Sequence, residues 1–83
     1  MKITGNVFVV TGAGNGMGRE VTLQLLRKGA RVAGVDLSEA GLAETKALAG
    51  QASGRLSTHV LSVADRAAVE ALPDAVIAEH GRV

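Results

Sequence analysis

Short apolar runs alternate with amphipathic segments along this chain. The first run, residues 6–10, is apolar without strict alternation, which is typical of a parallel strand buried on both faces. Further runs of similar length lie at 31–35, ending before Asp36, and at 55–61. After each run, apolar residues recur at helical spacing. The order β-α-β-α-β-α predicts an α/β domain with a parallel sheet and right-handed crossovers.

The three amphipathic segments predict helices, and the flanking residues predict their ends. The first helix, over 16–28, carries an apolar stripe that we expect to face the sheet, made of Met17, Val21, Leu25 and Leu26. The second, from 39 to about 49, follows Ser38, a residue type that often caps helices. The third, over about 66–80, follows Asp65, which can cap it in the same way.

Three other positions refine this arrangement. The glycine-rich segment 50–54 predicts a turn. Pro73 lacks the N–H that would bond the carbonyl of Val69, which predicts a kink or a division into two short helices. Val83 would be the first residue of a fourth strand. A doubly wound sheet reverses its strand order between strands one and four, so the first strand is expected to form an exposed apolar edge.

A glycine-rich turn joins the first strand to the first helix. Gly12, Gly16 and Gly18 allow positive φ angles and a close approach of a ligand to the backbone. The free N–H groups at a helix start, together with the positive end of its dipole, attract an anion such as phosphate. Asp36, after the second strand, occupies the place where such a βαβ unit puts its ribose-binding carboxylate. The combination predicts a dinucleotide site.

Composition narrows the classes of function. The 83 residues suffice for one small domain, and 47% of them are apolar, although Phe8 is the only aromatic residue. The net charge is +1, and no basic run with aromatic residues suggests nucleic acid. No apolar stretch reaches membrane-span length, no signal-peptide pattern opens the chain, and cysteine is absent. We therefore expect a cytoplasmic protein without nucleic-acid or membrane partners.

The motif Thr11-Gly12-x-x-x-Gly16-x-Gly18, with Asp36 and the segment 62–65 after the third strand, resembles the short-chain dehydrogenase/reductase family. The resemblance covers the whole chain but only the N-terminal part of a family member. It implies an incomplete NAD(P)-binding domain over residues 1–83, with a Rossmann-like three-layer fold. It also implies a parent oxidoreductase that interconverts an alcohol and a carbonyl compound.

The resemblance also implies a set of cofactor contacts. The loop glycines would hold the pyrophosphate, Asp36 the adenosine ribose, and the backbone of Val63 the adenine. Ser62 stands where the family usually has Asp, which weakens the expected bond to the adenine amino group. The predicted cofactor-binding residues are Gly12, Asn15, Gly16, Met17, Gly18, Asp36, Leu37, Ser62 and Val63.

The choice between the two nicotinamide cofactors follows from charge. A carboxylate at Asp36 accepts hydrogen bonds from both ribose hydroxyls of NAD and repels the 2′-phosphate of NADP. NADP-preferring members of the family carry a basic residue at the positions of Asn15 or Leu37, which are uncharged here. Arg19 is the nearest cation, and we expect it to be an exposed helix residue. The sequence therefore predicts NAD.

Several other polar residues are expected to have structural roles. The Thr11 hydroxyl should bond across the glycine loop. His59 and His80 lack further ligands at metal spacing, so no metal site is predicted. The family's catalytic Tyr-x-x-x-Lys has no counterpart because the chain contains no tyrosine. General acid–base catalysis at a substrate therefore has no agent, and the 83 residues alone are expected to be inactive.

Two alternatives remain open at this point. The chain could be a non-catalytic nucleotide-binding or regulatory module, which measurable nucleotide affinity of the isolated chain would favour. It could instead be a structural piece that forms a homo-oligomer by pairing through its first strand, which a dimer indifferent to nucleotide would favour. The partners expected for the parent enzyme are the nucleotide cofactor and a small alcohol or carbonyl substrate.

Overall fold

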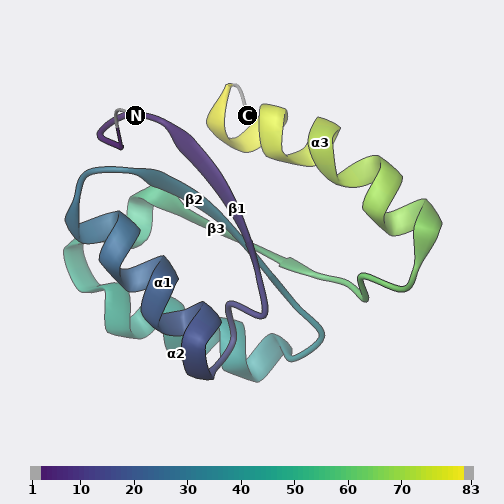
Figure 1. Cartoon of the computed structure of the whole chain (residues 1–83), viewed down its shortest axis with the longest axis horizontal. Coiled ribbons are helices and arrows are strands. Elements are labelled where there is room, and N and C mark those ends of the chain that lie inside the picture. The colour runs from purple at the N-terminus through teal and green to yellow at the C-terminus, as the bar shows by residue number, and fades with distance from the viewer. Residues whose placement is uncertain (1–2, 82–83) are drawn as a thin grey trace.

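The computed structural model describes residues 3–81, which form one three-stranded parallel sheet with helices on both faces (Figure 1). In chain order the elements are β1 (Val7–Thr11), α1 (Gly16–Arg27), β2 (Arg31–Asp36), α2 (Glu39–Ala49), the 3₁₀ helix η1 (Gly50–Arg55), β3 (Leu56–Val60) and α3 (Arg66–His80). This order confirms the predicted β-α-β-α-β-α arrangement. The expected fourth strand at Val83 lies outside the described residues.

The sheet has the order β1-β2-β3, with β2 in the centre and both pairings parallel. Phe8 of β1 pairs with Val32 of β2, which in turn pairs with Leu56 of β3. β2 is flanked by β1 and β3, and its residues Val32, Ala33, Gly34 and Val35 are all buried. The uninterrupted apolar run of this strand therefore reflects burial on both faces.

Alternation along the strands assigns the helices to opposite faces. On one face Val32 and Leu56 form the core cluster with Leu26 of α1, under α1 and α2. On the other face, Arg31 and Ser57 reach His80 of α3. Figure 1 shows the same three layers, with α1 and α2 together and α3 across the sheet. The fold is thus Rossmann-like, as predicted.

The buried face of α1 matches the predicted stripe at Leu26, which is buried, and at Leu25, which packs against the core cluster, but not at Met17 and Val21. Met17 and Val21 are 83% and 43% exposed, whereas Thr22 and Leu26 are buried. A Cβ at Gly18 would lie 2.1 Å from the carbonyl oxygen of Gly12, so the helix touches the end of β1 at its glycine. That contact turns the line of residues 18, 22 and 26 toward the sheet and rotates the more apolar line away.

Smaller corrections concern the second half of the chain. Segment 50–54, predicted as a turn, is part of η1, and β3 is shorter than the predicted 55–61. Arg55 ends η1 because its guanidinium donates to the carbonyls of Leu26 and Ala30. Pro73 does not divide α3, which is one continuous helix capped by the Asp65 carboxylate. The 15-residue helix therefore continues past the hydrogen bond that Pro73 removes.

Among residues 3–81, no helix is long and apolar enough to cross a membrane.

Candidate functional site

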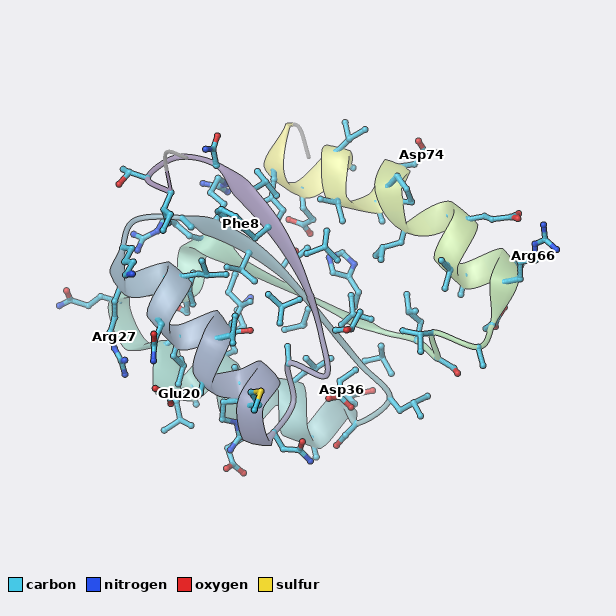
Figure 2. The ribbon with its side chains drawn as sticks, in the orientation of Figure 1. Phe8, Glu20, Arg27, Asp36, Arg66 and Asp74 are labelled. Atoms are coloured by element: carbon cyan, nitrogen blue, oxygen red, sulfur yellow. The ribbon has the colours of Figure 1, made fainter. Side chains whose placement is uncertain are left out.

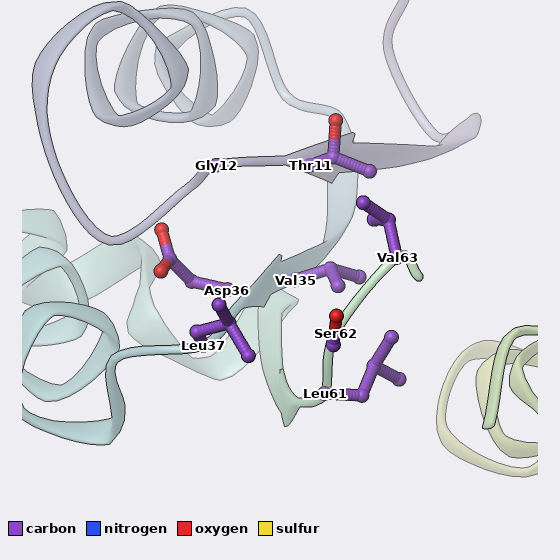
Figure 3. Close-up of a pocket in the computed structure, with 8 residues that line it drawn as sticks. All are labelled: Thr11, Gly12, Val35, Asp36, Leu37, Leu61, Ser62 and Val63. Carbon is purple, nitrogen blue, oxygen red and sulfur yellow. The ribbon is translucent and has the colours of Figure 1, made fainter. Parts of the chain in front are cut away.

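The carboxyl ends of the three strands surround a pocket of about 290 Å³. Such ends are where open parallel sheets bind their ligands. The pocket is lined by Thr11, Gly12, Val35, Asp36, Leu37, Leu61, Ser62 and Val63 (Figure 3). Five predicted site residues therefore meet there, although they come from three separate loops. Asp36 is the single ionisable side chain in this lining.

The glycine loop joins β1 to α1 at the rim of this pocket. Gly12 and Gly16 have φ angles of +71° and +54°, in the left-handed region that favours glycine. A Cβ at either position would meet nothing within 4 Å, so open space lies next to the backbone. Gly18 has a different role, because it permits the contact between α1 and β1 described above. Of the three glycines predicted to bind the cofactor, two therefore face open space and one packs against β1.

The first turn of α1 presents unpaired backbone donors. Asn15 is the N-cap residue and has an extended backbone, but its side chain makes no capping hydrogen bond. Within the described part of the chain, the amides of Gly16, Met17 and Gly18 also have no acceptor. Three N–H groups and the positive end of the helix dipole thus form a favourable place for an anion.

Asp36 links the end of β2 to the glycine loop. Its Oδ2 accepts a hydrogen bond of 2.8 Å from the Gly14 amide, and its Oδ1 accepts one of 3.0 Å from the Ser38 amide. These two amides, with Ser38 the stronger influence, hold the pKa of the carboxyl below its usual 3.8. The group is therefore charged at neutral pH, and each oxygen keeps a further lone pair for an incoming hydroxyl donor.

The other predicted residues lie in different surroundings. Met17 and Gly18 line a second hollow of about 490 Å³ between β1 and α1, together with Val9, Val10, Thr11 and Val21. Leu37 and Val63 are exposed at the mouth of the first pocket. Ser62 accepts a bond of 3.1 Å from the Ala64 amide, so its hydroxyl proton is available to a ligand. The predicted bond of the Thr11 hydroxyl across the loop is absent from the described residues; that side chain lines both hollows instead.

Arg19 corrects another prediction. Its side chain is only 20% exposed and pairs with Glu44 at 2.8 Å. It also donates to the Thr45 hydroxyl and to the carbonyls of Gly14 and Gly41. The guanidinium therefore holds the glycine loop against α2, and Arg19 is not the exposed helix residue that the sequence predicted.

A polar cluster lies on the face of the sheet that packs against α3. The Ser57 hydroxyl is 2.8 Å from Nε2 of both His59 and His80, and Arg31 donates to Nδ1 of His80 at 3.0 Å. The bonds of His80 to Arg31 and Ser57 tie α3 to the sheet. Residues 3–81 contain no group of three His, Cys, Asp or Glu side chains that could hold a metal ion. Sequence reasoning missed Ser57, because a single serine in a strand gives no signal of its partners.

Comparisons with known proteins agree with this geometry. The sequence model described as short chain dehydrogenase matches residues 6–83. D-threitol dehydrogenase of Mycolicibacterium smegmatis is 42% identical over 85 residues, covering 99% of this chain and 32% of that protein. A short chain dehydrogenase/reductase from Burkholderia phymatum, solved in complex with NAD, is 31% identical with a TM-score of 0.92, covering 100% of this chain and 30% of that one.

Carveol dehydrogenase from Mycobacterium avium, also solved in complex with NAD, is 26% identical with a TM-score of 0.88, covering 99% of this chain and 34% of that one. The chain thus spans about a third of the length of these relatives. The family match extends from the start of β1 through the glycine loop, the Asp36 pocket and α3. On this evidence the chain belongs to the short-chain dehydrogenase family.

Proposed function

We propose that this chain is the adenosine- and pyrophosphate-binding part of an NAD-dependent oxidoreductase. The observation that carries the proposal is one juxtaposition. A pocket whose only ionisable lining group is Asp36 lies beside the uncapped first turn of α1. The first feature suits an uncharged sugar with hydroxyl donors, and the second suits an anion. Adenosine diphosphate has both in the same molecule.

The adenosine half fits the pocket residue by residue. Asp36 would accept hydrogen bonds from the ribose hydroxyls through lone pairs that Gly14 and Ser38 leave free. Leu61 and Val63 offer apolar surface to the adenine, and Ser62 offers a hydroxyl proton. In this proposal Leu37 covers the outer side of the pocket as an exposed apolar wall.

The pyrophosphate half would lie against Asn15 and the first turn of α1. The amides of Gly16, Met17 and Gly18 would donate to phosphate oxygens, and Gly12 and Gly16 leave open space for them. Asp36 is charged and no basic side chain lines the pocket, so a 2′-phosphate would meet repulsion without compensation. This favours NAD over NADP.

The reaction assigned to the parent protein is the interconversion of a small alcohol and a carbonyl compound. The dehydrogenase names of several relatives support this assignment. NAD supplies the hydride-accepting chemistry when it is bound. In this proposal the chain's own residues bind and orient the cofactor. The chain contains no tyrosine that could exchange a proton with a substrate. Residues 1–83 alone are therefore proposed to bind cofactor without turnover.

The test is titration of the chain with ADP and NAD, using Gly16→Ala and Gly50→Ala. Both glycines have positive φ, +54° and +58°, and both would place the new Cβ in open space. Both substitutions place the new side chain at a positive φ without a steric clash, and only Gly16 adjoins the proposed phosphate site. We expect Gly16→Ala to weaken ADP binding at least tenfold more than Gly50→Ala, because the methyl group occupies phosphate space. Absence of ADP binding to the unaltered chain, or equal loss in both variants, would overturn the proposal.

A further inference from the structure

The peptide group between Ala13 and Gly14 is held at both ends. Its N–H, on Gly14, donates to Asp36 Oδ2 at 2.8 Å. Its carbonyl oxygen, on Ala13, accepts from the Thr45 hydroxyl at 2.7 Å. Ala13 and Thr45 are both fully buried, so water does not compete for the bond between them, whereas the Gly14–Asp36 bond is partly buried. The orientation of one buried peptide group therefore fixes where the Asp36 carboxylate is held.

Arg19 continues this connection on the other side of Thr45. Its Nε donates a hydrogen bond to Thr45 Oγ1 at 2.9 Å, and the Thr45 hydroxyl donates one in turn to the Ala13 carbonyl. Thr45 also lies 3.1 Å from the Gly41 carbonyl, but the shorter bond goes to Ala13. The result is a directional chain of donors from the Arg19 cation, through Thr45 and the peptide, to the Asp36 anion. Hydrogen bonds aligned in this way polarise and strengthen one another.

Close packing prevents the loop from escaping this arrangement. A Cβ at Gly14 would lie 2.8 Å from Asp36 Oδ2, and one at Gly41 would lie 2.6 Å from the Gly14 carbonyl oxygen. Arg19 donates to the carbonyls of both glycines. The loop, α2 and the end of β2 thus meet at two positions where only glycine fits, and the guanidinium closes the junction.

We infer that Thr45 and Arg19 are positioning residues for cofactor selection: they hold the Asp36 carboxylate in the orientation that accepts ribose hydroxyls and rejects a 2′-phosphate. This inference rests on the function proposed above. Neither side chain lines the adenosine pocket. Their effect passes through the Ala13–Gly14 peptide group.

The experiment compares Thr45→Val with Thr45→Ser. Valine keeps the shape of threonine but can neither accept the hydrogen bond from Arg19 nor donate one to Ala13, whereas serine keeps the hydroxyl that does both. Two quantities are measured in each variant: the ratio of NAD to NADP affinity, and the pKa of Asp36 followed by carboxyl-carbon NMR without ligand. We expect Thr45→Val to lower the affinity ratio about tenfold, the size of losing a hydrogen bond to a charged group. The pKa of Asp36 should rise toward its ordinary value, and Thr45→Ser should restore both.

Controls separate this role from a general effect on folding. Thr58→Val makes the same substitution at an exposed threonine of β3. Arg19→Lys keeps the positive charge but loses the planar guanidinium that donates to several acceptors at once. Arg66→Lys is the matched control. Figure 2 shows Arg66 on α3, extending away from the molecule and far from Asp36. If Thr45→Val does not fold, Arg19→Lys decides by the same two measurements.

The outcomes distinguish the inference from the function on which it rests. If the unaltered chain binds neither NAD nor NADP, the proposed function fails and this inference falls with it. If the unaltered chain prefers NAD while the folded variants keep both the affinity ratio and the Asp36 pKa, the inference alone is overturned.

Discussion

At the scale of single residues, the surroundings of Asp36 determine what the pocket can bind. Its pKa is low because backbone amides donate to it, so at neutral pH the pocket carries a full negative charge. The Leu37 side chain next to it is exposed. A cation placed at Leu37 would therefore extend over the mouth of the pocket without displacing a packed side chain.

Replacing Asp36 with Ala and Leu37 with Arg together should shift preference from NAD toward NADP. The change removes the repulsive carboxylate and supplies a guanidinium for the 2′-phosphate. The ratio of the two affinities, from calorimetric titration, should change by at least tenfold. Leu48→Arg, which adds the same charge at another exposed leucine, is the control and should leave the ratio unchanged. An unmoved ratio in the double variant would contradict the role given to Asp36.

Gly41 lies inside α2, and its contact with the glycine loop cannot be predicted from its position in a helix. Glycine inside a helix costs about 1 kcal/mol relative to alanine, so Gly41→Ala would ordinarily stabilise α2. Here the added Cβ would lie 2.6 Å from the Gly14 carbonyl oxygen, a backbone atom that cannot move aside cheaply. Overpacking of this kind costs about 1–3 kcal/mol, so we expect a net loss of stability.

Urea unfolding measures this loss, and Gly54→Ala is the matched control because its new Cβ would meet nothing within 4 Å. A Gly41→Ala variant as stable as the unaltered chain, or more stable, would show that the loop yields and that the junction is not tight.

The residues of the site differ in how far the sequence revealed them. Gly12, Gly16, Gly18 and Asp36 could be selected because fixed spacings around a strand and a helix start are visible along the chain. Thr45 and Gly41 could not, because their partners in the loop are distant in sequence and a threonine in a helix is compatible with many roles. Arg19 was misjudged for the same reason: its acceptors belong to α2 and to the loop carbonyls.

At the scale of elements, α3 is attached to the sheet by few contacts, of which the polar ones are specific. Val76 is its one buried residue, and near its end His80 bonds to Ser57 and Arg31. Because Arg31 donates to Nδ1 of His80, that ring is neutral and donates from Nε2 to Ser57. The Ser57 hydroxyl then donates to Nε2 of His59, so this ring is neutral as well. The cluster requires two uncharged imidazoles.

Acidification should therefore loosen α3. Burial is the main cause that lowers the pKa of both histidines below 6.5, although Glu79 opposes this effect. The Arg31 cation and His59 lower the pKa of His80 further. With folded pKa values below the unfolded ones, the unfolded chain binds more protons, so stability is full above about pH 6.5 and is lost as the pH falls through the folded values.

We expect the midpoint temperature of thermal unfolding to decrease when the pH is lowered from 7.5 to 5.5. The backbone amides of α3 should be the first to lose protection from hydrogen exchange. His80→Gln removes one titrating group but keeps an amide that can bond Ser57, so its midpoint should depend less on pH. Equal dependence in both proteins would exclude His80 as the cause. The Asp36 carboxyl titrates below 3.8 and does not contribute in this window.

The elements themselves were largely predictable, and their faces less so. Strand and helix bounds follow from short apolar runs, Ser38 and Asp65 as caps, and Gly81 as a helix stop, all of which act locally. The orientation of α1 depends instead on where Gly18 touches β1, a tertiary contact that outweighed the apolar line through Met17 and Val21. Pro73 lies inside one continuous helix, so the predicted division is wrong, and the predicted kink stays a prediction.

At the scale of the whole molecule, the described sheet leaves one side of β1 without a strand partner. Beside it lies a hollow of about 490 Å³ lined by apolar side chains, including Val9, Met17 and Val21. These three are 41%, 83% and 43% exposed. An unpaired strand edge next to an apolar surface is a template for association with another chain.

The 83-residue chain should therefore self-associate through β1. Sedimentation equilibrium should give a weight-average mass above 8.4 kDa that rises with concentration. Val9→Lys places a charge on the strand edge and should restore the monomer, because association would then bury an unpaired ammonium group. Leu48→Lys, at an exposed leucine on α2, is the control and should leave association unchanged. A monomeric chain whose β1 amides are protected from hydrogen exchange would contradict association through β1. If Val9→Lys leaves the association intact, the interface lies on a different face.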